Sequence, residues 1–352
     1  MINAKSILEI ERKLKQGSKD INDYLELGSL YLDEGEHDKL LALYDQIIEL
    51  PLKNIEKARV YYERGQALQF LDNKDEAISS LKTSFGLLET EQNSIDSLDL
   101  KGIIQYNFFL LSIDTDLAQQ YANDAIRYFS LLLGGYPAAE DEDIYHIYSH
   151  LADIYEKLGY HKKALKYYQQ ALKKSRDTNN VVWIMNGIAS IYAAMGKFDK
   201  ASQYYNEALN RADETIPVSK IHFDMGKMYF DLSLYDQAED SFRYALEKRI
   251  KDPQLKKSRE YEVDIYWYLG TIAYETDDYK NIEICFDNVL ENINDQHPYY
   301  SNSYLTLGHY NLMNENFRKA WEYYNKVLTA PQADDEEKKV AKESLTQIPF
   351  NA

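Results

Sequence analysis

The sequence predicts an all-α solenoid, built as a right-handed superhelix of antiparallel helix pairs. A small residue is followed three positions later by Tyr, twelve later by Ala, sixteen later by an aromatic residue and nineteen later by Ala. Three consecutive units with this pattern start at Ala152, Ala189 and Gly226, so the repeat advances by 37 residues each time. A fixed period of this length indicates stacked helical repeats, each of which packs on its neighbours.

Each unit is predicted to contain two helices joined by a short turn. The first, the A helix, carries the small residue and the Tyr three positions later. The second, the B helix, carries the Ala, aromatic and Ala residues at spacings of 4 and 3, which place them on one face. Small residues let the two helices approach closely, and the aromatic residues fill the space beside them. Gly159, Gly196 and Ser233 mark the turns between the helices.

This pattern resembles the tetratricopeptide repeat (TPR), whose consensus is W-x2-L-G-x2-Y, then A-x3-F, then P. Its Leu-Gly pair is present as Leu27-Gly28, Leu269-Gly270 and Leu307-Gly308, and nearly so as Met225-Gly226. Tyr occupies the Trp position, and Pro51 and Pro331 lie near the closing position. The resemblance implies a binding protein whose A helices line a concave groove. It implies no catalytic activity.

The repeats are predicted to fill most of the chain. Residues 1–19 read as an N-terminal capping helix, residues 20–331 as about eight TPR-like repeats, and residues 332–352 as a C-terminal capping helix and tail. The third unit is the least regular, and residues 133–143 behind it are predicted to form a loop or hinge that proteases cut first. The repeats are anchored near Gly28, Gly65, Tyr106, Ala152, Ala189, Gly226, Gly270 and Gly308.

Composition restricts the classes of partner. The formal net charge of -18 argues against nucleic-acid binding and against anionic membrane surfaces, because both need a basic surface. Two interpretations of the acidic charge stay open: a preference for basic partners, or a soluble surface that repels itself. The single Cys285 excludes an internal disulfide. With no membrane-length apolar run and no signal peptide, a cytoplasmic protein is expected.

The residues at −6, −3, +1 and +4 from each small residue form a stripe on the A helix, which we call the A stripe. Since the resemblance places the A helices on the concave face, this stripe is predicted to bind a peptide or protein. Amides can hold a peptide backbone, and aromatic residues can receive its side chains. The open alternative is that some stripe residues pack on an adjacent helix. The predicted binding residues are Trp183, Asn186, Ser190, Lys220, Phe223, Lys227, Phe230, Trp267, Thr271, Tyr274, Asn302 and His309, with the centre of binding expected across the fifth to seventh repeats. The second unit offers Arg59, Tyr62, Gln66 and Gln69 at the same places.

No constellation for catalysis, a metal or a cofactor is found. His146 and His150 lie four residues apart, with Asp143 and Asp153 nearby, and that spacing can hold a metal. The segment lacks the Glu that a zinc-protease motif places after its first His, so groove or surface histidines are expected instead. Cys285 is expected to be an inert, buried thiol. The chain is therefore predicted to have no enzymatic activity, no cofactor and no metal site.

Two functions remain. The first is an intracellular TPR scaffold or adaptor that binds a peptide or protein partner in its concave groove. The second is a peptide-responsive TPR regulator, a signalling-peptide receptor that controls a second protein. It is suggested by an architectural resemblance to bacterial peptide receptors such as the Rap-type phosphatases, carried by repeats longer than 34 residues and by groove amides. The short segment before the first repeat favours the first function.

Overall fold

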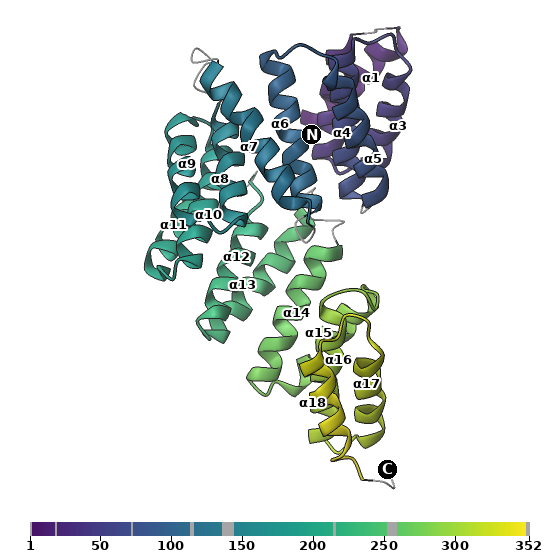
Figure 1. Cartoon of the computed structure of the whole chain (residues 1–352), viewed down its shortest axis with the longest axis vertical. Helices are drawn as coiled ribbons and strands as arrows, with labels where there is room; N and C mark the ends of the chain where they lie inside the picture. Colours follow the sequence, from purple (N-terminus) through teal and green to yellow (C-terminus); the bar gives the residue numbers. More distant parts are fainter. Residues whose placement is uncertain are drawn as a thin grey trace. The chain divides into compact units, whose positions relative to one another are not determined.

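The computed structural model describes residues 2–17, 20–71, 73–112, 116–135, 144–213, 216–251 and 259–349. Within these ranges the chain forms eighteen α-helices and one short 3-10 helix, and no described residue lies in a β-strand (Figure 1). The prediction of an all-α solenoid fold is therefore confirmed at the level of its secondary structure. Most of the predicted hinge, residues 136–143, lies outside the described residues.

The chain divides into two compact units. Unit 1 comprises Met1–Pro217 with Lys251–Lys257, and unit 2 comprises Val218–Ile250 with Ser258–Ala352. The helices of unit 1 are α1 (Ile2–Lys15), α2 (Ile21–Asp33), α3 (His37–Ile48), α4 (Asn54–Phe70), α5 (Lys74–Glu89), α6 (Ile95–Leu111), α7 (Ala118–Gly135), α8 (Tyr145–Lys157), α9 (His161–Lys174), α10 (Thr178–Ala194) and α11 (Phe198–Arg211). Those of unit 2 are α12 (Ser219–Asp231), α13 (Tyr235–Lys248), α14 (Arg259–Glu275), α15 (Tyr279–Glu291), α16 (Tyr299–Met313), α17 (Phe317–Thr329) and α18 (Asp335–Leu345).

Consecutive helices pack as hairpins, in which the even-numbered helix is the A helix and the following one is the B helix. The pairs run from α2 with α3 to α10 with α11 in unit 1, and from α12 with α13 to α16 with α17 in unit 2. One helix outside the hairpins flanks each series. In unit 1 α1 packs on α2, and in unit 2 α18 packs on α16 and α17. This order follows from the short A–B turns, which leave no alternative to an antiparallel neighbour.

The small and aromatic residues of the repeat meet inside each pair. Phe242 and Tyr324 are completely buried on their B helices, and each ring lies against a glycine of the A helix. A Cβ atom at Gly226 would lie 2.8 Å from the Phe242 ring, and one at Gly308 would lie 2.7 Å from the Tyr324 ring. Both distances are too short for van der Waals contact. The repeated small residue is therefore a packing requirement of the aromatic residue opposite it.

The third pair, α6 with α7, departs from the predicted register. The close approach falls at Gly102, where a Cβ atom would lie 2.6 Å from the Phe129 ring, and not at the predicted anchor Tyr106. The connection between these helices runs from Leu111 to Ala118 and is longer than those of the central pairs. The close approach therefore lies about one helical turn earlier on α6 than the predicted anchor.

Six of the A–B turns share one backbone feature, a left-handed residue seven positions after the anchor. Glycine takes this place at Gly35, Gly159 and Gly196, but Ser233, Asp277 and Glu315 take it with φ near 57°. The following backbone N–H donates to a carbonyl five residues earlier, as from Asn316 to Asn311 at 2.8 Å. This hydrogen bond is that of a Schellman motif, which ends the A helix.

Glu315→Gly is expected to stabilise unit 2 by about 0.5–1 kcal/mol, because a side chain is strained at positive φ and glycine is not. The matched reverse change, Gly196→Ala, should destabilise unit 1 by about 1 kcal/mol for the same reason. Chemical denaturation of both variants would measure the two effects. A lower stability of Glu315→Gly would contradict this explanation of the turn.

Candidate functional site

The twelve predicted binding residues lie on A helices, but they fall into both units. Trp183, Asn186 and Ser190 are on α10 of unit 1, and the other nine are on α12, α14 and α16 of unit 2. Lys220 and Lys227 are exposed, Asn186 and Phe223 are buried, and the remaining eight are partly buried. The predicted centre is thus two separate stretches of A stripe, and each is described within its own unit.

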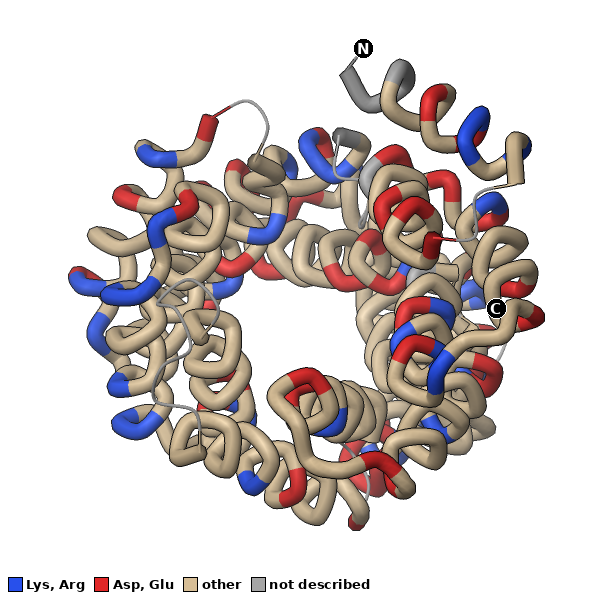
Figure 2. Tube along the Cα trace, turned by 90° about the horizontal axis from the view of Figure 1, so that it is seen from above, with Lys and Arg blue, Asp and Glu red and all other residues tan. Residues whose placement is uncertain are grey.

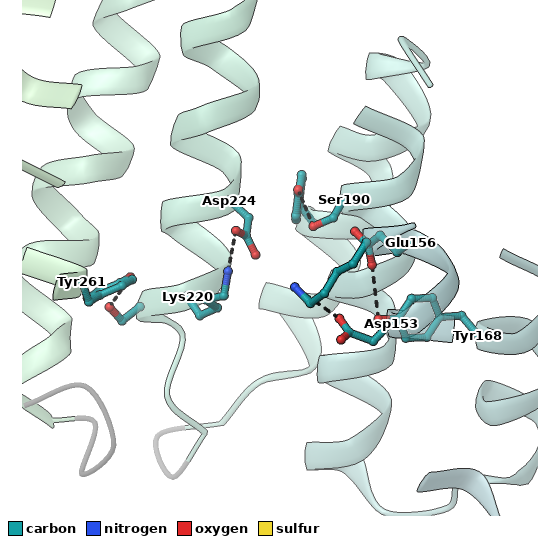
Figure 3. A network of polar contacts seen from close by, with 10 residues as sticks. Asp153, Glu156, Tyr168, Ser190, Lys220, Asp224 and Tyr261 are labelled. Atoms are coloured by element: carbon teal, nitrogen blue, oxygen red, sulfur yellow. Dashed lines mark hydrogen bonds and ion pairs between the residues drawn. The ribbon is translucent and has the colours of Figure 1, made fainter. Parts of the chain in front are cut away.

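On α12, Phe223 is part of the core, which corrects its prediction as a binding residue. Its side chain is 7% exposed, and its ring lies 5.1 Å from that of Tyr261 and 5.7 Å from that of Phe242. Lys227 stays exposed one helical turn further on. Lys220 is also exposed, but its Nζ atom forms an ion pair with Asp224 Oδ1 at 2.8 Å (Figure 3). Of the charged residues of this stripe, Lys227 is therefore the one best placed to contact a partner.

On α14, Trp267 belongs to an aromatic and acidic cluster. Its ring stacks on that of Tyr299 at 4.7 Å, and the Tyr299 hydroxyl donates to Asp264 Oδ1 at 2.9 Å. Burial raises the pKa of Asp264, while the Tyr299 hydrogen bond and the charge of Lys227 lower it. Trp267 therefore holds α14 to the start of α16 besides offering a surface. Thr271 donates to the Trp267 carbonyl at 2.9 Å, within the same helix.

On α16, His309 faces α18. Its ring lies edge-on to that of Tyr324 at 5.6 Å, and its Nε2 atom lies 3.4 Å from Ser344 Oγ of α18. Burial lowers the pKa of His309, which keeps the imidazole neutral near pH 7. The His309 side chain thus contacts α18, and this contact leaves less of its surface available to bind a partner.

On α10, the polar side chains turn toward neighbouring helices. Asn186 is 7% exposed, and Ser190 Oγ lies 3.2 Å from the hydroxyl of Tyr205 on α11 (Figure 3). Because Asn186 is buried, we expect Asn186→Ala to lower stability as well as any binding, since truncation of a buried polar side chain is destabilising. Trp183, by contrast, is only partly buried.

A groove of about 350 Å³ lies on the A helices of unit 1, away from the predicted centre. We call it the acidic groove. Its walls come from three successive A helices and from the residue that precedes α4. The lining residues are Ile21, Asn22 and Leu25 of α2, Lys53, Ile55, Glu56, Arg59, Tyr62 and Glu63 of α4 and its N-cap, and Asp96, Asp99, Leu100 and Ile103 of α6.

Two of the four carboxylates of the acidic groove have structural partners. Glu56 Oε2 accepts the backbone N–H of Lys53 at 2.9 Å, which caps the start of α4. Asp99 Oδ1 lies 3.0 Å from His146 Nε2 of α8. Glu63 has neither a hydrogen bond nor an ion pair among the described residues. Burial raises its pKa, and the charge of Arg59 opposes that shift.

Arg59 and Tyr62 of the acidic groove belong to the predicted A stripe of the second unit, whereas Glu63 was missed. Glu63 lies two residues before the small residue of its helix, as do His150 on α8 and Asp224 on α12. The sequence signal that could have identified Glu63 is a titratable residue that recurs two positions before the small residue of the A helix.

The pair His146 and His150 forms a polar seam between α6 and α8. The His150 ring lies 4.7 Å from that of Tyr106 and 5.6 Å from that of Phe129, and burial lowers its pKa to about 4. The Tyr106 hydroxyl donates to Asp153 Oδ2 at 2.7 Å. Both histidines are thus used in packing. Within the part of the chain that the structure describes, which excludes Asp143, no three His, Cys, Asp or Glu side chains are grouped to hold a metal.

The one cysteine of the chain lies in an environment that makes its thiol unreactive. Cys285 is buried on α15, and burial raises the pKa of its thiol to about 11, so little thiolate exists near pH 7. Among the described helices, none combines the length and the apolar character needed to cross a membrane. Figure 2 shows acidic residues along the helices of both units, interspersed with the less numerous Lys and Arg.

Comparisons with known proteins agree on the repeat. Four family models described as tetratricopeptide repeat match residues 24–54, 58–87, 143–214 and 186–255. A TPR repeat-containing protein of Methanocaldococcus jannaschii is 26% identical over 176 residues, which are 49% of this chain and 26% of that protein. The chain thus spans about a quarter of the length of this curated relative.

Two solved structures are similar to the whole chain. The apo form of the quorum sensor NprR from B. thuringiensis has a TM-score of 0.54 at 14% identity and covers 97% of this chain and 100% of its own. The human IFIT1 dimer with PPP-AAAA has a TM-score of 0.58 at 16% identity and covers 98% of this chain and 85% of its own. At such identities the likeness concerns the fold.

Proposed function

This chain is a tetratricopeptide-repeat protein, and from that premise we propose that it is a scaffold or adaptor that binds a peptide or protein on its A helices. Repeats of this family serve protein–protein interaction, because stacked helix pairs present extended binding surfaces. The chain would act by binding alone. Its buried, protonated thiol and its packed histidines offer no group for catalysis.

The acidic groove is the observation that carries this proposal. Its walls come from three successive A helices and the N-cap of α4, as expected for a site that runs across repeats. Its apolar residues offer contact area, and its carboxylates offer attraction to positive charge. In unit 2 the exposed Lys227 and the half-buried Phe230 of α12 provide a further stretch of A stripe. The overall charge of -18 supports a basic partner.

Selection from a phage-displayed random peptide library on the immobilised full chain tests the proposal. We expect specific peptides whose affinity falls about fivefold or more when an A-stripe residue is changed, as in Tyr62→Ala or Phe230→Ala. The control is Gln203→Ala, an exposed position on the B helix α11, which should leave affinity unchanged. Isothermal titration would measure each affinity.

Two outcomes would reject the proposal. One is the absence of any specific peptide or protein ligand. The other is loss of affinity in Gln203→Ala while both A-stripe variants bind like the wild type. Small-angle scattering separates the scaffold from the alternative, a peptide-responsive regulator. An unchanged radius of gyration on adding the selected peptide fits a scaffold, and a clear decrease fits a regulator.

A further inference from the structure

The acidic groove has two kinds of wall. Ile21 and Leu25 of α2, Ile55 of α4 and Ile103 of α6 give it apolar sides, and all four side chains are partly exposed. Carboxylates from α4 and α6 lie among them. An apolar channel that leads to a negative charge is complementary to a long alkyl stem with a cationic end, since such stems bury their methylene groups along apolar surface.

Glu63 is the carboxylate that lacks a partner. It is largely enclosed, and burial raises its pKa, which reflects the difficulty of holding a charge there. Arg59 lies one helical turn earlier and acts on Glu63 through its charge, but within the described residues the two form no ion pair. An enclosed carboxylate without a counter-ion is unfavourable, and a cation that enters the groove would relieve this.

The other charges of the groove do not satisfy Glu63. Glu56 accepts a hydrogen bond from the backbone at the start of α4, and Asp99 lies against His146. Both residues are acidic, so neither can act as a counter-ion for Glu63. Lys53 and Arg59 are exposed. The lining has four acidic residues against these two basic ones, so an anionic ligand is disfavoured.

We propose that the acidic groove receives a lysine or arginine side chain of a peptide partner, with its cationic group paired to Glu63. This inference rests on the proposed function and specifies the partner's chemistry at that site. The alkyl stem of the guest residue lies against the isoleucines of the three A helices. Asp96, exposed at the start of α6, contributes further attraction. Arg59 competes with the guest for Glu63.

Small probes test the groove directly. The full chain, labelled with ¹³C at isoleucine methyl groups, is titrated with n-butylguanidinium, and 1-pentanol serves as the uncharged probe of similar length. We expect the methyl signals of Ile21, Ile55 and Ile103 to shift with butylguanidinium, with an affinity on the order of fivefold or more above that for 1-pentanol.

Matched variants then identify which charged residue determines the affinity for the cation. Glu63→Gln should reduce the butylguanidinium affinity to that of 1-pentanol, while Arg59→Gln should raise it about twofold or more because the competing cation is gone. Glu89→Gln removes one exposed charge of α5 outside the groove and should match the wild type. The methyl spectrum of each variant reports whether it is folded.

The results separate the two proposals. Equal affinities for both probes, or a Glu63→Gln variant that binds like the wild type, would overturn the cation site. If selected peptides bind the A stripe but neither prefer Lys or Arg nor respond to Glu63→Gln, the scaffold proposal stands and this inference falls. If butylguanidinium binds as expected but the chain binds no peptide or protein, the groove chemistry stands and the proposed function falls.

Discussion

Phe242→Ala is expected to lower the free energy of unfolding of unit 2 by about 3–5 kcal/mol. The ring is completely buried, stacks on Tyr268 at 4.8 Å and fills the space above Gly226. Its removal takes away this apolar contact and leaves a cavity between α12, α13 and α14. Urea denaturation followed by circular dichroism measures the loss. Asp240→Ala, an exposed change on the same helix, should stay within about 0.5 kcal/mol of the wild type.

A double-mutant cycle tests whether the effects of changing Gly226 and Phe242 on stability are coupled. Gly226→Ala alone should destabilise by about 1–3 kcal/mol, because its Cβ would overlap a ring that cannot move away. In the Phe242→Ala background the same change should be neutral or stabilising, since the space is open and Ala favours a helix. Additive effects would mean that the contact with the ring does not explain the glycine.

Acidification from pH 7 to pH 4 is expected to destabilise unit 1 by about 3 kcal/mol through His150 alone. Burial and the charge of His146 lower the folded-state pKa of His150 to about 4, and Asp99 opposes this shift. The unfolded chain therefore takes up the proton first, near its ordinary pKa of about 6.5. The stabilisation is complete above that value and is lost as the pH falls through the folded-state pKa.

His150→Phe isolates this contribution, because Phe can still pack against Tyr106 and Phe129 but does not titrate. Between pH 7 and pH 4, the free energy of unfolding should decrease by about 3 kcal/mol less for the variant than for the wild type. The charges that face this seam, His146, Asp99 and Asp153, are common to both proteins. Parallel pH profiles would show that His150 is not the cause.

The core positions of the repeats were predictable because the packing of a large ring on a small residue determines their spacing in the sequence. The sequence spacing predicts the buried places of Tyr205, Phe242 and Tyr324 directly, since a small residue is required opposite each large ring. Gly102 was not found in this way. Its distance along the chain from Phe129 depends on the length of the α6–α7 connection, and the regular spacing of the other repeats does not contain that length.

The A stripe was predicted less well, because several of its side chains pack on neighbouring helices. Phe223 and Asn186, both three residues before the anchor, are buried, and Trp267 at the same place stacks on Tyr299. This position packs toward a neighbouring repeat. Which stripe residues do so depends on the angle between repeats, which the repeat spacing alone does not give. At the +1 position Lys227 is exposed, whereas Ser190 and His309 lie against side chains of neighbouring helices.

Three polar contacts between helices join helices that are near neighbours along the chain. The hydrogen bond from Tyr106 to Asp153 and that between Asp99 and His146 each span 47 residues, and the one from Ser301 to Glu337 spans 36. Chains whose contacts are this local fold quickly, because no long loop must be closed first. A ribosome makes about 50 residues in several seconds, far longer than a helix needs to form. Each new repeat can therefore pack on the preceding repeat while the next one is still being synthesised.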